Sequence, residues 1–203
     1  PKQWPDVAGK VHPVAGQPVV LAWTGLGCPM SKLYRPRLAR LADEFVPKGV
    51  RFFLLNSNSQ DAPADLKKLA AEFAFPLIRD AGGQLARRLQ VERTTEVLLL
   101  DANGQIRYRG AVDDQFGFKE TEAGGVGAFR RPAPTQAYLK QAIVAVLAGR
   151  PVAPAKTEPY GCALGLDEAP RGNAVTFHQH IEPLLQVHGQ ECHHTGGGGP
   201  FAF

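Results

Sequence analysis

The residues with the clearest chemical potential lie in QVHGQECHHTGGGGPF, residues 186–201, where Cys192 is followed directly by His193. A Cys-His pair is the second half of C-x-x-C-H, the motif that attaches c-type haem. Gly189 stands where the first cysteine of that motif would be. A single cysteine can still form one thioether, and the histidine after it can still bind iron. We therefore predict haem c bound through Cys192, with His193 as an axial iron ligand.

Histidines around this motif are candidates for the second iron ligand. Five of the six histidines in the chain fall within a short C-terminal stretch. They are His178, His180, His188, His193 and His194. Because the only methionine, Met30, is remote in sequence, a second histidine is the nearer candidate. Two alternatives stay open: a zinc or copper site built from His188, Cys192 and His193 or His194, or a motif that binds no metal.

A second reactive position is Cys28, between a buried strand predicted at residues 18–23 and a helix predicted at 31–45. The free N–H groups and positive dipole at a helix N-terminus stabilise a thiolate and lower the cysteine pKa. The stretch reads Cys-Pro-Met-Ser, so Ser31 occupies the place of the second cysteine that a dithiol site needs. Cys28 is therefore either a reactive single thiol or a packed residue at the start of the helix.

Alternating strands and helices must position Cys28. Short apolar runs predict strands, and apolar residues at helical spacing predict helices. The strands are expected at 18–23, 50–56, 75–80, 96–101 and 105–110, and the helices at 31–45, 62–74, 82–89 and 135–149. This order predicts a mostly parallel sheet covered on both faces, with the last two strands forming an antiparallel hairpin at its edge. Residues 113–134 contain Gly and Pro and are predicted to be an irregular excursion.

Composition and charge narrow the class of protein. The 203 residues are 44% hydrophobic and 21% charged, which indicates a globular protein. The net charge of +4 is spread without long runs of one sign, so we expect a solvated surface and no nucleic-acid partner. No apolar run is long enough to span a membrane. Because the chain has no initiator Met and no signal-peptide pattern, we expect a processed product whose original N-terminus is not included.

Several stretches carry a resemblance to a known family. They are CPMSKLYRPRLARLADEF, GVRFFLLNSN, FPLIRDAGGQLARRL, TTEVLLLDANGQIRYRG and VDDQFG. Together they resemble redoxin-domain proteins of the thioredoxin superfamily, related to the peroxiredoxin and thiol-specific-antioxidant group, over roughly residues 5–150. The following TFHQHIEPLLQVHGQECHHTGGGGPF is similar to the start of a cytochrome c-like segment, which follows the redoxin domain in secreted bacterial members of that family.

This resemblance implies an α/β, thioredoxin-like fold with a central mixed sheet flanked by helices and a short C-terminal helical haem-binding extension. The implied domains are a redoxin domain at 1–149, a Pro-rich linker at 150–172 and a partial cytochrome c-like segment at 173–203. The implied function is that of a bacterial redox or electron-transfer component, periplasmic or otherwise extracytoplasmic. About thirty residues cannot enclose a haem, so we expect other protein subunits or redox partners in a larger assembly, compatible with peripheral association with a membrane complex.

The chain departs from the family pattern at the thiol site. Thioredoxin-like sites place a Thr-Pro pair opposite the cysteine, whereas this chain has Thr94 and Thr95. A peroxidatic site would have Thr three residues before its cysteine, whereas Thr24 is four residues before Cys28. With no Cys at 31 and no Pro at 95, we expect low peroxidase and disulfide-reductase turnover. The alternatives to the haem function are a monothiol thiol-disulfide or peroxide oxidoreductase centred on Cys28, and a structural accessory subunit.

The third cysteine, Cys162, lies just past the Pro-rich stretch. If Cys192 carries haem, Cys28 and Cys162 remain as an even pair, and an oxidising compartment favours a disulfide between them. Sequence alone does not show whether their Cβ atoms approach closely enough for a bond. A disulfide and a buried free thiol therefore both stay open.

Overall fold

The computed structural model describes residues 3–120 and 124–166. The strands are β1 (Gln3–Pro5), β2 (Val11–Pro13), β3 (Val19–Trp23), β4 (Arg51–Asn56), β5 (Leu77–Arg79), β6 (Val97–Leu100), β7 (Ile106–Gly110), β8 (Phe116–Glu120) and β9 (Val126–Arg130). The helices are α1 (Pro29–Phe45), α2 (Pro63–Ala70), α3 (Gln84–Leu89) and α4 (Tyr138–Leu147), with short 3-10 turns η1 (Val46–Lys48) and η2 (Ala81–Gly83). The predicted α/β class is confirmed.

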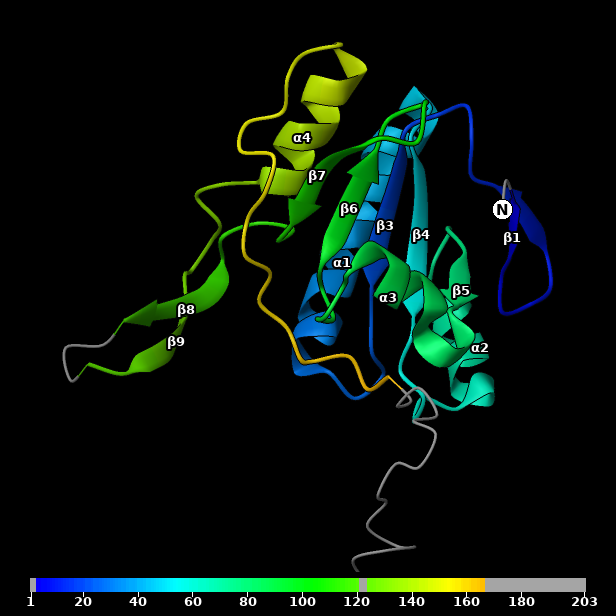
Figure 1. Ribbon diagram of the computed structural model, residues 1–203, viewed down its shortest axis with the longest axis horizontal. Coiled ribbons are helices and arrows are strands. Elements are labelled where there is room, and N and C mark those ends of the chain that lie inside the picture. The colour runs from blue at the N-terminus through cyan, green and yellow to red at the C-terminus, as the bar shows by residue number, and fades with distance from the viewer. Residues whose placement is uncertain (1–2, 121–123, 167–203) are drawn as a thin grey trace, which may run out of the picture. The chain divides into compact units, whose positions relative to one another are not determined.

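The central sheet has five strands in the order β5-β4-β3-β6-β7 (Figure 1). β3 pairs in parallel with β4, and β4 with β5. β6 pairs antiparallel with both β3 and β7, so the sheet is mixed, and antiparallel pairing begins in its middle rather than only at the predicted edge hairpin. Between β5 and β6 the chain passes through η2, α3 and the loop after it, and β6 then runs along β3 in the opposite direction.

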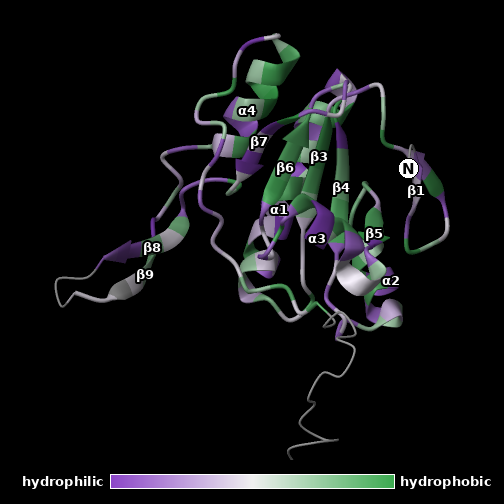
Figure 2. Ribbon diagram, in the orientation of Figure 1, coloured by the Kyte–Doolittle hydropathy of each residue, from purple (hydrophilic) through white to green (hydrophobic). Residues whose placement is uncertain are grey.

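Both faces of the sheet are buried, which explains why β3 is an unbroken apolar run in the sequence. Alternate side chains of β3 point to opposite faces. Val20 and Ala22 belong to a core with α1, α2 and α4, whereas Leu21 and Trp23 belong to a second core that includes α3. Figure 2 shows the corresponding hydrophobic colour along the central strands. The two cores fix the C-terminal end of β3, where the chain enters α1.

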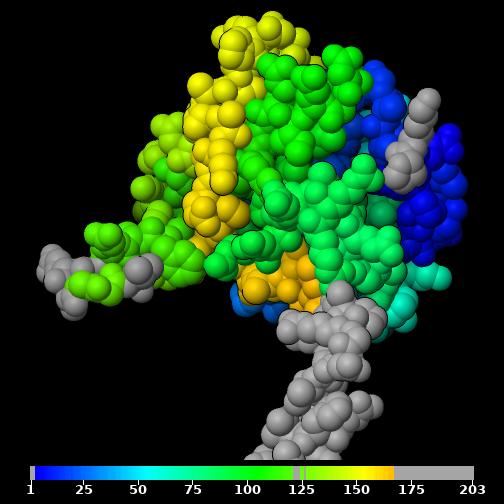
Figure 3. Space-filling view, viewed as in Figure 1, coloured from blue at the N-terminus to red at the C-terminus, as the bar shows by residue number. Residues whose placement is uncertain are grey.

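Residues 113–134, predicted to be irregular, contain the antiparallel hairpin of β8 and β9. This hairpin extends away from the central sheet (Figures 1 and 3). At its base, Tyr34 packs edge-on against Phe116 and donates a hydrogen bond of 3.1 Å to buried Asp113, which also pairs with Arg37. The sequence signal was weak because the hairpin is rich in glycine and has no Asn-Gly turn.

Past α4, residues 155–166 form an extended segment that we call the strap. It contains no helix or named strand and runs over the surface, as the yellow-to-orange segment in Figure 3 shows. The strap begins on β7, where Arg109 N–H donates to Ala155 O at 3.0 Å and Thr157 N–H donates to Arg109 O at 3.0 Å. This part of the predicted Pro-rich linker therefore packs on the domain. Within the described ranges, no helix is long and apolar enough to cross a membrane.

Candidate active site

Cys28 is the N-cap of α1, as predicted. Its extended backbone (φ −78°, ψ 118°) leads into Pro29, and its Sγ accepts a hydrogen bond from Ser31 N–H at 3.5 Å. Pro suits the first helical position because its ring fixes φ near the helical value and that position needs no N–H donor. The sequence thus folds locally so that the sulfur faces the free N–H groups of the helix N-terminus, where negative charge is stabilised.

The strap brings Cys162 to Cys28. The two Sγ atoms lie 2.8 Å apart, and the thiol of Cys162 donates a hydrogen bond to the sulfur of Cys28. Both cysteines are free thiols, and the separation exceeds a covalent S–S bond of about 2.05 Å. Cys28 is buried, with 5% of its surface exposed, whereas Cys162 is exposed. Two cysteines 134 residues apart in sequence therefore form one site.

Thr94 connects the two cysteines. Its hydroxyl oxygen lies 3.0 Å from Cys28 Sγ and accepts a hydrogen bond of 3.0 Å from Cys162 N–H. Its backbone N–H donates to Cys162 O at 2.8 Å. Thr94 is fully buried, so these contacts are not shared with solvent. The single hydroxyl hydrogen of Thr94 can point either to Cys28 Sγ or to Cys162 O, which is 3.3 Å away.

Further hydrogen bonds hold the strap on both sides of Cys162. Before it, Tyr160 O accepts from Thr95 Oγ1 at 2.8 Å, and Gly161 O accepts from Arg93 Nη1 at 3.1 Å. After it, Leu164 N–H donates to Glu92 O at 2.8 Å, and Gly165 O accepts from Ser59 N–H at 2.8 Å. These contacts include a short antiparallel bridge between Arg93 and Ala163. The position of Cys162 therefore does not depend on a bond between the sulfurs.

Glycine is required at position 161 by a close approach. A Cβ atom there would lie 1.8 Å from Thr94 O and 2.8 Å from Thr95 Oγ1. Any larger residue would push the strap away from the sheet. The backbone of residues 94–95 and the strap are thus in contact next to the sulfurs, and the left-handed backbone of Thr95 (φ 69°) lies at the same point.

The hydrogen bonds around Cys28 change its acidity. Burial alone would raise the pKa of the Cys28 thiol, but hydrogen bonds from the Cys162 thiol, the Thr94 hydroxyl and Ser31 N–H outweigh it and lower that pKa to about 7. The pKa of Cys162 is raised, because its thiol donates to Cys28, because it is partly desolvated and because a thiolate lies beside it. Cys28 is accordingly the sulfur that carries the charge.

Ser31, at the place of the expected second cysteine, has a different role. Its hydroxyl accepts a hydrogen bond of 3.2 Å from Gly25 N–H, in the loop before Cys28. The same loop is fixed from the other side by buried Asp61, whose carboxylate accepts from Leu26 N–H at 3.0 Å and from Asn56 Nδ2 at 2.6 Å. Ser31 and Asp61 therefore shape the turn between β3 and α1.

Arg35 binds the same turn. Its guanidinium donates to Gly25 O at 2.9 Å and to Thr24 Oγ1 at 3.4 Å. The hydroxyl of buried Thr24 thus accepts a hydrogen bond from Arg35. Among the contacts of the described residues, no hydrogen bond joins Thr24 to Cys28. Thr24 is a structural residue of the turn here.

The predicted site residues divide into two groups. Cys28 stands at the start of α1, and Thr94 and Thr95 lie beside it, as the sequence indicated. Cys162, whose pairing the sequence left open, joins them. The residues proposed for haem or another metal lie outside the described residues. They are His178, His180, His188, Cys192, His193 and His194. Within residues 3–120 and 124–166, no group of three or more His, Cys, Asp or Glu is arranged to hold a metal ion.

The sequence missed the contribution of Thr94, which was noted only for the missing proline beside it. Its hydroxyl, not a proline ring, occupies the space against Cys28. The only indication in the sequence was a threonine after a polar stretch, and this pattern is too common to identify a functional residue.

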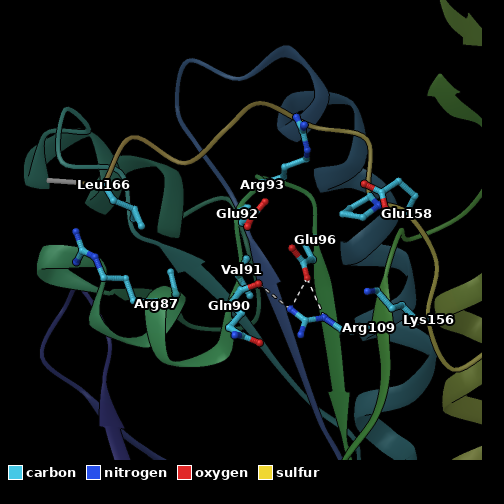
Figure 4. Close-up of a pocket in the computed structure, with 12 residues that line it drawn as sticks. Arg87, Gln90, Val91, Glu92, Arg93, Glu96, Arg109, Lys156, Glu158 and Leu166 are labelled. Atoms are coloured by element: carbon cyan, nitrogen blue, oxygen red, sulfur yellow. Dashed lines mark hydrogen bonds and ion pairs between the residues drawn. The ribbon is translucent and has the colours of Figure 1, made fainter. Parts of the chain in front are cut away.

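A cleft of about 600 Å³ lies beside the strap (Figure 4). α3 and the loop after it form one side, and Lys156, Glu158 and Pro159 of the strap line the other. Within it, Arg109 pairs with Glu96 at 2.8 Å and donates to the carbonyl oxygens of Leu89, the last residue of α3, and Gln90, the first residue after it. This arginine ties the sheet, the loop and the start of the strap together, and neither sulfur lines the cleft.

The fold and the cysteine at the N-terminus of α1 define a thioredoxin-like protein. The Redoxin family matches residues 10–126, more than half of the chain, so the chain belongs to this family. Cys28 lies within the match, whereas Cys162 lies beyond it. No curated protein sequence matches the chain.

Solved structures resemble most of the chain. An uncharacterised conserved protein from Geobacillus kaustophilus is 26% identical, with a TM-score of 0.70 over 83% of this chain and 90% of that one. A hypothetical protein from Sinorhizobium meliloti is 25% identical, with a TM-score of 0.66 over 82% and 91%. A Chlorobium tepidum protein, named as a candidate thiol:disulfide interchange protein, DsbE, is 22% identical, with a TM-score of 0.54 over 71% and 92%, and shows the fold alone.

Proposed function

We propose that the protein is a thiol–disulfide oxidoreductase whose redox centre is the pair Cys28 and Cys162. The observation that carries this proposal is the 2.8 Å separation of the two sulfur atoms. An internal disulfide needs two sulfurs within reach, so that one can attack a mixed disulfide formed on the other. In this chain the strap supplies the second sulfur, so Ser31 in Cys-Pro-Met-Ser does not leave Cys28 without a partner thiol.

The lowered pKa of Cys28 supports the same function. A thiol with a pKa of about 7 is substantially ionised at neutral pH, and the thiolate is the form that attacks a disulfide and leaves from one. The buried hydroxyl of Thr94 stabilises the charge and holds the strap backbone at the same time. Low disulfide-exchange turnover, expected from the missing cysteine at 31, is therefore replaced by the expectation of active exchange.

The monothiol alternative differs from the dithiol function in one respect: Cys162 would not be needed for activity. A monothiol peroxide reductase also needs open access for peroxide to Cys28, whereas this residue is 5% exposed beneath the strap. The dithiol function is for these reasons the one we propose. We further propose a protein dithiol or disulfide as the redox partner, in keeping with the interchange activity in the name of the Chlorobium protein. We also propose an extracytoplasmic location, because disulfides form and persist in oxidising compartments.

Oxidation of the purified chain tests the dithiol function. In glutathione redox buffers, Cys28 and Cys162 should become linked, as peptide mapping after rapid acid quenching and alkylation would show. Cys28→Ser and Cys162→Ser should each abolish catalysed reduction of a protein disulfide, whereas Cys192→Ser, the matched control, should retain it. Full activity in Cys162→Ser would establish the monothiol alternative instead.

We propose separately that Cys192 carries haem c through one thioether, with His193 on the iron. The support is the Cys-His pair itself, since it places a sulfur and an imidazole next to each other as haem attachment requires. Intact-mass measurement of the denatured chain should show the added haem, because a thioether survives unfolding. A mass equal to the bare polypeptide would reject covalent attachment, and zinc or copper in metal analysis would favour the alternative metal site.

A further inference from the structure

We infer that Cys162, on the strap, is the sulfur that bonds to the redox partner, and that Cys28, at the helix N-terminus, is the internal sulfur. This inference rests on the proposed dithiol function and adds the order of events to it. The second sulfur comes from a segment laid over the first, so the cysteine at the helix N-terminus is the buried one and the cysteine on the strap is the exposed one.

Access to the two sulfurs differs. Cys162 is exposed, whereas Cys28 is 5% exposed, between the start of α1, Thr94 and the strap. A thiolate attacks a disulfide in line with the S–S bond, from the side opposite to the leaving sulfur, and its rate depends on access. Because Cys162 is exposed and Cys28 is buried, we infer that this side is open for attack on Cys162 and closed for attack on Cys28.

The strap would have to detach before a partner reached Cys28. Backbone and side-chain hydrogen bonds hold residues 160–165 to the domain on both sides of Cys162, including those of Thr94 and Thr95. Attack on Cys162 requires none of them to break. The structure thus favours exchange at the outer sulfur with the strap in place.

Cys28 is also the better leaving group. Its sulfur receives hydrogen bonds from Ser31 N–H and the Thr94 hydroxyl, and it lies at the positive end of α1. Of two disulfide sulfurs, the one that forms the more stable thiolate leaves faster. Access and leaving-group stability therefore select the same direction of attack.

When the oxidised protein meets a partner dithiol, the exchange takes place in two steps. A partner thiolate attacks Cys162 Sγ, the Cys28–Cys162 bond breaks, and its electron pair leaves as the Cys28 thiolate. The second partner thiolate then attacks the partner sulfur of the mixed disulfide and releases Cys162, which takes up a proton. Two electrons pass from the partner dithiol to the protein disulfide, and the partner leaves as a disulfide.

Rapid-quench trapping on the full chain tests this order. Oxidised wild-type protein is mixed with glutathione, quenched in acid at short times, alkylated and mapped by peptide mass spectrometry. We expect the glutathione adduct on Cys162 and the alkyl group on Cys28, with at least about tenfold excess over the opposite arrangement. A predominant adduct on Cys28 would overturn the inference. If no Cys28–Cys162 disulfide forms beforehand, the proposed function itself fails, so the two failures are distinguishable.

Variants that lack one of the two site cysteines give a second measurement, read at each cysteine by peptide mass spectrometry because Cys192 is also present. In Cys28→Ser, Cys162 should react with glutathione disulfide faster than Cys28 does in Cys162→Ser, by about tenfold once each rate is corrected for its thiolate fraction. Equal corrected rates would contradict the access argument. Serine retains the size and hydrogen-bonding capacity of the cysteine, and circular dichroism would show that both variants fold.

Discussion

The hydroxyl of Thr94 lies 3.0 Å from the sulfur of Cys28 and accepts a hydrogen bond from the backbone N–H of Cys162. One buried side chain therefore contacts the sulfur that carries the charge and the segment that carries the second sulfur. In the thiolate state the hydroxyl hydrogen points to Cys28. In the disulfide state, when that sulfur is a weak acceptor, Cys162 O is available at 3.3 Å.

Replacement of this hydroxyl should raise the pKa of Cys28. In Thr94→Val the side chain keeps its shape but loses the hydrogen bond to a charged sulfur, which corresponds to a rise of about one pKa unit. Thr94→Ser keeps the hydroxyl and should stay near the wild-type value. The pH dependence of iodoacetamide labelling, followed by peptide mass spectrometry, gives both pKa values. An unchanged pKa in the valine variant would show that the hydrogen bonds from Ser31 N–H and the Cys162 thiol are enough to lower the pKa of Cys28.

A larger residue at position 161 should separate the sulfurs. In Gly161→Ala the new Cβ would meet Thr94 O, so the strap must shift away from residues 94–95. We expect the equilibrium constant for the Cys28–Cys162 disulfide, measured against glutathione, to fall about tenfold, because disulfide geometry tolerates little displacement. Gly27→Ala is the matched control, since a Cβ there meets nothing within 4 Å. An equal fall of this equilibrium constant in both variants would show that the effect comes from general destabilisation of the fold.

Much of this architecture was predictable from residue patterns. Apolar runs such as 18–23 identify strands buried on both faces, and Cys28 before Pro29 indicates the start of α1. The antiparallel placement of β6 was not predictable, because no residue pattern in β6 or in the segment before it sets the direction in which β6 pairs with β3. Local patterns encode local structure, whereas strand order and strand direction depend on contacts between segments far apart in the chain.

The second sulfur could not be assigned from sequence for a related reason. Cys162 is in an irregular segment, and its place beside Cys28 results from individual hydrogen bonds to Thr94, Thr95 and Arg93. Such contacts between segments far apart in the chain leave no periodic pattern. The cysteine count raised the pairing as one alternative, and only the path of the strap brings the two sulfurs together.

Loss of the Asp61 carboxylate should destabilise the turn before Cys28. Asp61 is buried and accepts hydrogen bonds from Leu26 N–H, Asn56 Nδ2 and Asn58 Nδ2. Asp61→Ala leaves these donors without their acceptor, at a cost of about 3 kcal/mol in the free energy of unfolding. Urea denaturation measures this loss. The neighbouring Asp65→Ala removes only an exposed pair with Lys68 and should change little. A similar loss of unfolding free energy in both variants would show that water replaces the Asp61 carboxylate as the hydrogen-bond acceptor.

The reactivity of Cys28 should follow its lowered pKa. The pKa of about 7 lies below the ordinary thiol value of 9.0. Cys28 is therefore mostly a thiolate at pH 8 and mostly a protonated thiol at pH 6. Labelling of Cys28 should therefore rise only about tenfold between these pH values, whereas an unperturbed thiol would rise nearly a hundredfold.

The same shift links pH to the stability of the reduced protein. Because the folded-state pKa is depressed, the stabilisation is fully present above the ordinary pKa of 9.0 and is lost as the pH falls through about 7. The reduced wild type should thus gain stability over Cys28→Ser as the pH rises from 6 to 9, in urea denaturation at each pH. Cys162→Ser should reduce this gain, because the Cys162 thiol donates one of the hydrogen bonds that hold the charge on Cys28. A stability difference that does not change over this range would show that Cys28 titrates alike in the folded and unfolded chain.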